Sequence, residues 1–163
     1  DATNPEWQRD LSVTHNKIGD VLVAQGDQQA ALQAFGKSLA IAEALAARDP
    51  ANIRWQRDLS VCHNKIGDVL ATQDDGPAAL QAFGKSLAIR EALAAQHPAN
   101  TDAQFELAVS HANLGKLSTI GENEREQHLI AGLQILDSLA DSGRLMPSQD
   151  NRDWFRKRLG EIG

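Results

Sequence analysis

The sequence has little of several features that would restrict where this protein works. Cys62 is the only cysteine among 163 residues, so no internal disulfide can form. Its apolar runs are far too short to span a membrane, and its first residues do not have the pattern of a signal peptide. We therefore expect a cytoplasmic protein that neither forms disulfides nor enters a membrane.

Basic residues are also in deficit. The chain has 16 Lys and Arg against 22 Asp and Glu, which gives a formal net charge of -6. A general nucleic-acid binder needs the opposite balance, because its phosphate contacts are made by Lys and Arg. Nucleic acid is therefore not an expected partner. Hydrophobic residues make up 42% of the chain, which is enough for a single domain with a buried core.

The sequence contains an internal repeat with a period of 48 residues. When residues 7–54 are aligned with 55–102, 37 of the 48 positions are identical. A third, more divergent copy follows, in which LAVSHANLGKL from Leu107 aligns with LSVTHNKIGDV from Leu11. Glycine and histidine each recur in one column of this alignment: Gly19, Gly67 and Gly115, and His15, His63 and His111. Periods of this length are typical of stacked supersecondary units.

Each copy has the pattern of two helices. Apolar residues recur at helical spacing in both halves, as at Leu11, Ile18 and Leu22 in the first half. The breaks begin at Gln25, Gln73 and Ile120, where Gly26 and Gly121 suit a left-handed C-terminal cap and Pro77 suits the first turn of a helix. Three asparagines in register, Asn4, Asn52 and Asn100, are suited to cap the first helices. Asp49-Pro50 and His97-Pro98 should end the second helices.

These residues resemble the tetratricopeptide repeat. Ile18-Gly19, Leu22, Ala31, Phe35 and Ser38 match its L-G-x-x-Y and A-x-x-x-F-x-x-A pattern, and the second copy matches at the equivalent positions. The third copy keeps Leu114-Gly115, and its aromatic position is aligned near Ala131 and Leu133. The family period is about 34 residues, so the chain resembles the long-helix variety found in bacterial multidomain proteins.

The resemblance implies an all-α fold, a right-handed α-solenoid of three helical hairpins plus a C-terminal capping helix. The repeats are expected at 4–51, 52–99 and 100–143, and the capping helix at 148–162 with Ser148 as its cap, all within one domain of residues 1–163. Asp1 to Asn4 align with Asp49 to Asn52. On that alignment we expect the chain to be a fragment of a larger protein.

Other motifs predict no chemistry. FGKS at Phe35 and Phe83 lacks the earlier glycine of a phosphate-binding loop and falls within a helix, so Gly36 and Gly84 are expected to permit close helix contact instead. The three column histidines come from successive repeats, too far apart to share a metal, and His97 and His128 do not align with them. Cys62 aligns with the small residues Thr14 and Ser110, which favours a packed side chain. We expect no enzymatic activity, no cofactor and no metal.

In the tetratricopeptide family the first helices line a concave groove, and the resemblance therefore implies the groove residues here. Asn16 and Asp20 are four residues apart and share a helix face, which the second copy repeats. The full set of candidate partner-binding residues is Arg9, Asn16, Asp20, Arg57, Asn64, Asp68, Phe105 and Lys116, interleaved with small and apolar positions such as Val13, Val23 and Val61. Solvated helix faces with no partner would have the same polar pattern.

The expected function is that of a protein–protein interaction module that binds a peptide or helix of a partner in this groove. The partner would be basic or of mixed charge, and the chain itself a monomer or a weak homo-oligomer. The alternative is a structural spacer or self-association domain of a larger bacterial signalling or effector protein. Concentration-dependent mass would favour the alternative, whereas a receptor would stay monomeric until its ligand is added.

Overall fold

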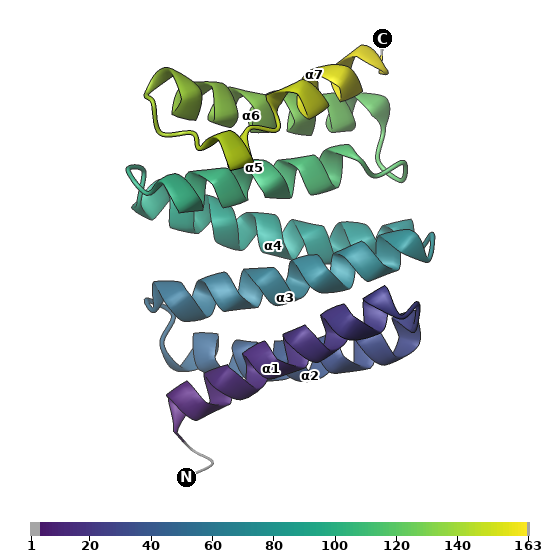
Figure 1. The fold of residues 1–163 in the computed structure, drawn as a ribbon, viewed down its shortest axis with the longest axis vertical. Coiled ribbons are helices and arrows are strands. Elements are labelled where there is room, and N and C mark those ends of the chain that lie inside the picture. Colours follow the sequence, from purple (N-terminus) through teal and green to yellow (C-terminus); the bar gives the residue numbers. More distant parts are fainter. Residues whose placement is uncertain (1–3, 163) are drawn as a thin grey trace. The chain divides into compact units, whose positions relative to one another are not determined.

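The computed structural model describes residues 4–162, and these residues are helical almost throughout (Figure 1). The fold is all-α. The helices are α1 (Pro5–Ala24), α2 (Gln28–Arg48), α3 (Ile53–Thr72), α4 (Gly76–Gln96), α5 (Thr101–Gly115), α6 (Glu122–Asp141), the short 3₁₀ helix η1 (Pro147–Gln149) and α7 (Arg152–Gly160). None of the helices in this described part is both long and apolar enough to cross a membrane. The alignment of residues 1–3 with 49–51 lies outside the described residues.

The described residues form two compact units that divide inside α4, the first ending at Ile89 and the second beginning at Arg90. In the first unit α1 and α2 pair as an antiparallel hairpin, and α3 packs against α2 (Figure 1). In the second unit α5 and α6 form the corresponding hairpin, and α7 packs against α6. The chain therefore consists of sequentially paired helices, as a helical repeat requires.

The three predicted asparagine caps and the two predicted proline stops are confirmed. The side-chain oxygen of Asn52 accepts a hydrogen bond from the backbone amide of Trp55, and Asn4 and Asn100 cap α1 and α5 in the same way. The helices α2 and α4 end immediately before Asp49-Pro50 and His97-Pro98. Because these signals act within a few residues, they are the part of the fold that the sequence specifies most directly.

The turns within the hairpins are partly as expected. Gly26 is left-handed, with a φ of 81°, as predicted for a C-terminal cap. Gly121 is not left-handed: it precedes α6 at its N-cap, with a φ of -62°, because α5 ends early and the turn belongs to the next helix. Asp74, which aligns with Gly26, is left-handed as well, with a φ of 58°. An L-residue in that conformation is strained.

A large side chain lies on each column glycine. A methyl group added at Gly67 would lie 2.6 Å from Cε1, 2.7 Å from Cδ1 and 3.0 Å from Cζ of Phe83, and one at Gly19 would be closer still to Phe35. Both rings are fully buried. The column glycines are therefore at close contacts, as predicted, and the contact is between the backbone of the first helix and an aromatic ring of the second. Gly36 and Gly84 differ from the expectation, because no atom lies within 4 Å of a methyl group added at either.

The third hairpin places Leu129, not Ala131 or Leu133, in the position of the aromatic ring. A methyl group at Gly115 would lie 2.7 Å from Cγ of Leu129. The alignment was wrong here because α5 ends at Gly115, whereas α1 and α3 each run five residues beyond their column glycine. The next helix, α6, therefore begins seven residues after its column glycine, whereas α2 and α4 begin nine residues after theirs, and the contact residue comes two positions earlier.

The C-terminal helix is shorter than predicted. It runs over Arg152–Gly160 and follows a 3₁₀ turn that contains Ser148. The Asp150 carboxylate, rather than Ser148, accepts the backbone amide of Arg152, at 3.2 Å. Phe155 of α7 is buried on Gly132 of α6, so the ring-on-glycine contact recurs between α6 and α7.

The glycine contact yields the first prediction. Gly67→Ala should destabilise the protein by about 1–3 kcal/mol, because the added methyl group overpacks against a buried ring that has no room to move. Gly84→Ala in the facing helix is the matched control. It removes a flexible residue from an open helical position and should be neutral or stabilising by up to about 1 kcal/mol. Chemical denaturation measures both, and equal effects would contradict the contact.

The strained turn yields the second prediction. Asp74→Gly should stabilise the protein by about 0.5–1 kcal/mol, because glycine adopts a positive φ without steric cost. The reverse change at the aligned position, Gly26→Asp, should destabilise it by a similar amount. Melting temperatures of the two variants give the comparison, and a loss of stability in Asp74→Gly would show that the carboxylate compensates for the strain.

Candidate partner-binding surface

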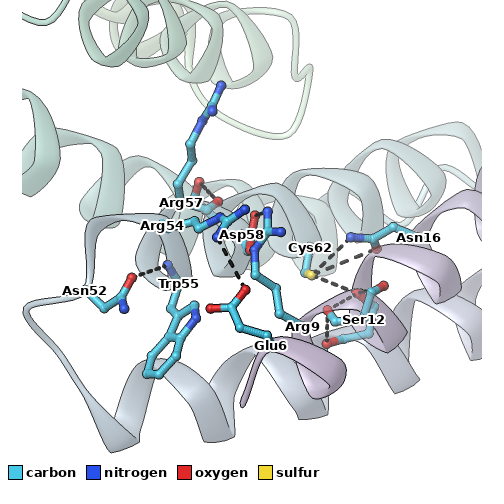
Figure 2. A network of polar contacts seen from close by, with 12 residues as sticks. Glu6, Arg9, Ser12, Asn16, Asn52, Arg54, Trp55, Arg57, Asp58 and Cys62 are labelled. Atoms are coloured by element: carbon cyan, nitrogen blue, oxygen red, sulfur yellow. Dashed lines mark hydrogen bonds and ion pairs between the residues drawn. The ribbon is translucent and has the colours of Figure 1, made fainter. Parts of the chain in front are cut away.

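Three ion pairs join α1 to α3 along the edge where the groove was predicted. Arg9 Nε lies 2.6 Å from Asp58 Oδ2, and the two side chains are largely buried (Figure 2). The exposed pair of Arg54 and Glu6 is 3.4 Å apart, and Lys65 Nζ lies 2.5 Å from Asp20. Arg9 is therefore occupied in holding the two helices together. Arg57 is exposed on α3, and its carbonyl accepts a hydrogen bond from Ser60.

Asn16 and Asn64 were expected in the groove, but both side chains are buried, at 9% and 8% exposure. The amide of Asn16 donates to Cys62 Sγ at 3.5 Å (Figure 2). Ser38 Oγ lies 3.1 Å from the same sulfur. The hydroxyls of Ser12 and Ser38 are 2.8 Å apart. This polar cluster joins α1, α2 and α3, so the amide of Asn16 serves the helix interface and cannot reach a partner without a rearrangement.

Cys62 is the packed side chain that the sequence predicted. It is fully buried. Burial raises the pKa of its thiol, against the opposing effect of the hydrogen bonds to Ser38 and Asn16. Because a nucleophilic cysteine needs its thiolate, this environment disfavours reactivity.

Asp20 and Asp68, by contrast, are exposed and line one cavity. It has a volume of about 180 Å³, and its other lining residues come from α1, α2 and α3: Val23, Gln28, Phe35, Lys65, Val69 and Thr72. Phe35 and Val69 are buried, so the floor is apolar. Lys65 contacts both the acidic rim and the apolar floor. Its ammonium group pairs with Asp20 and lies 5.6 Å from the centre of the Phe35 ring.

In the second unit the two predicted residues have different surroundings. Phe105 is half-buried against the core and lines an apolar cavity of about 250 Å³ together with Val109, Trp154 and Phe155. Lys116 was expected on the first helix of its repeat, but it lies just beyond α5, as the C-cap residue. Its ammonium donates to the Asn113 side chain at 3.0 Å. The early end of α5 is the physical reason for this difference.

Two histidines that the alignment kept apart are in contact. Nδ1 of His111 lies 3.0 Å from Nδ1 of His128, with ring centres 5.3 Å apart. Burial, followed by the nearby His128, lowers the pKa of His111 to about 4. Burial also lowers the pKa of His128, although Glu124 and Glu91 oppose it. The expectation that His128 lies away from the column was wrong, because α6 begins two residues closer to its column glycine than α2 and α4 do to theirs, which shifts the register of its residues.

No metal centre is present in the described residues: nowhere from 4 to 162 do three His, Cys, Asp or Glu side chains gather as a ligand set.

Three residues that line the cavity were not predicted from the sequence: Gln28, Lys65 and Thr72. Glu6 and Arg54 occupy the same column of the repeat with opposite charge. Comparing charges between successive copies would have indicated that the edges of α1 and α3 are bound to each other.

Known proteins do not add to this description. No protein-family model matches the chain, and no curated protein is significantly similar to it.

The histidine pair yields the third prediction. The unfolded chain takes up a proton at His111 below about pH 6.5, whereas the folded chain does so only near pH 4. Stability that is fully present above pH 6.5 should therefore be lost as the pH falls toward 4, by about 1 kcal/mol once solvent screening is allowed for. Denaturation at several pH values measures the slope in this window. His111→Gln should flatten it, and an unchanged slope in this variant would rule out the pair as its source.

Proposed function

We propose that this chain is a protein-interaction module that binds a basic or mixed-charge segment of a partner protein. The observation that carries the proposal is the cavity between α1 and α3, which has Asp20 and Asp68 at its rim and Phe35 and Val69 in its floor. A lysine or arginine side chain matches both surfaces, because its apolar stem packs on hydrophobic groups while its charged head stays at a polar rim.

The proposal rests on fewer residues than the sequence suggested. Asn16 is buried and Arg9 is paired to Asp58, so these two residues shape the wall between α1 and α3 without making contact with the partner. Asp20 is partly neutralised by Lys65. Binding therefore requires the incoming cation to compete with Lys65, which favours partners with more than one positive charge.

The resemblance to tetratricopeptide repeats supports the same location for the partner-binding site, since the first helices line the groove in that family. On that resemblance we also propose that the hairpins continue as a right-handed α-solenoid. A spacer domain of a larger protein is the alternative, and it makes no use of the cavity.

The fourth prediction tests the cavity. A panel of basic, mixed-charge and acidic peptides of equal length is titrated against the protein, and the basic and mixed-charge peptides should bind most tightly. The double variant Asp20→Asn/Asp68→Asn should weaken them several-fold at low salt and less at high salt, because exposed charges are screened within about 10 Å at 0.1 M. Its stability should change by no more than about 0.5 kcal/mol for each substitution.

The matched control is Glu126→Gln/Asp141→Asn, which removes the same net charge from exposed positions on α6. It should leave peptide affinity unchanged. Equal weakening by both double variants would show that only the overall charge matters. Failure of every peptide to bind would favour the spacer.

A further inference from the structure

Two imidazole rings meet end to end in the third hairpin. Nδ1 of His111 on α5 lies 3.0 Å from Nδ1 of His128 on α6, and the ring centres are 5.3 Å apart. Both rings are half-buried, so solvent reaches them. Burial is the main reason that the pKa of His111 falls to about 4 and that the pKa of His128 falls below its usual value. Both rings are therefore neutral at pH 7, the form in which imidazole binds a metal ion.

This pairing is not a product of the duplication. The contacts on the column glycines set the register of the second helices, and in that register the position of His128 is alanine in both other hairpins. These residues, Ala34 and Ala82, are buried. The other two column histidines therefore have a methyl group at the corresponding position, where the third hairpin has a second imidazole. The first two hairpins are natural controls for the third.

The separation of the two nitrogen atoms matches two neighbouring ligands of one metal ion. An imidazole nitrogen binds such an ion at about 2.0–2.1 Å. Two nitrogens 3.0 Å apart then subtend an angle of about 95° at the ion, close to the right angle of a square arrangement. This geometry is typical of Cu²⁺ and Ni²⁺. Each ring has to turn by about 40° to direct its lone pair at the ion, and the χ2 torsion of histidine is broad enough for such a turn.

Negative charge lies beside the pair. Glu124 precedes His128 by one turn on the same face of α6, and Glu91 of α4 is the second carboxylate that acts on this ring. Both carboxylates are exposed, and in the register of the second helices Glu124 replaces Ala30 and Ala78. Their charges favour a cation. Within residues 4–162 no third His, Cys, Asp or Glu completes a ligand set, so water is expected at the remaining positions of the ion.

We propose that His111 and His128 chelate a divalent metal ion through both Nδ1 atoms, Cu²⁺ most tightly and Ni²⁺ next. In the free protein the Nδ1–H of one ring donates to Nδ1 of the other. The ion takes the place of that hydrogen, which moves to Nε2 of the same ring, so both rings stay neutral. The order of the two metals follows from their general affinity for nitrogen ligands. The chelate ties α5 to α6 and makes no use of the cavity at Asp20, so it is independent of the proposed function.

The fifth prediction is measured by titrating the full chain, without an affinity tag, with Cu²⁺ at pH 7. One ion should bind per chain, and electron paramagnetic resonance should show a tetragonal signal split by two nitrogen atoms. The melting temperature should rise with Cu²⁺ concentration, because the ion binds only the folded pair. His128→Ala, which restores the residue of the other two hairpins, should weaken binding about a hundredfold, since two linked ligands gain about 10²–10⁴-fold over one.

The matched control is His15→Gln, which removes a column histidine that has no second imidazole at the corresponding position. It should leave Cu²⁺ affinity unchanged, and circular dichroism without metal confirms that both variants are folded. Equal weakening by His15→Gln and His128→Ala would identify an adventitious ion only. A signal without splitting from two nitrogen atoms, or full affinity in His128→Ala, would overturn the proposal.

Discussion

In each of the hairpins described here, a large side chain of the second helix lies directly on a glycine of the first. Phe35 lies on Gly19, Phe83 on Gly67 and Leu129 on Gly115. A methyl group would sit at nearly equal distances from three neighbouring ring carbons of Phe83, which places it over the face of the ring. The absence of a side chain lets the two helices approach, and the ring fills the space that remains. The rest of the packing follows from this separation.

The polar contacts of the first unit depend on that approach. Ser12 reaches Ser38 only because α1 and α2 are close, and the same closeness lets Cys62 of α3 join them through Ser38 and Asn16. With this side of α1 and α3 fixed, the ion pair of Arg9 and Asp58 forms along their edge, and Asp20 and Asp68 are left at the rim of the cavity.

The local signals in the sequence predicted the helices well, and the contacts between helices much less. Asn52 caps its helix and Pro50 follows the end of another because both effects act within one turn. The burial of Asn16 could not be seen in the same way. A polar residue on a polar stripe looks exposed until the position of the next helix is known, and the clue was the small residue Cys62 opposite it.

The prediction of the contacts in the third hairpin was wrong for a different reason. Its sequence has drifted, and the register of Leu129 and His128 depends on α5 ending at Gly115, an end that no capping residue or proline predicts from the sequence.

The identity between the first two copies also concealed a difference in environment. Trp7 and Trp55 occupy one column of the repeat, yet one is exposed and the other buried, because burial depends on whether a neighbouring helix covers that face.

The contact between ring and glycine can be observed directly by nuclear magnetic resonance. A proton held over the face of an aromatic ring resonates upfield of its usual position. The α protons of Gly19, Gly67 and Gly132, each beneath a phenylalanine ring, should be displaced upfield. Those of Gly36 and Gly84, with no neighbour at that distance, should resonate at ordinary helical values. If the α protons of Gly67 and Gly84 have the same chemical shifts, the ring of Phe83 does not lie on Gly67, and the packing described here is wrong.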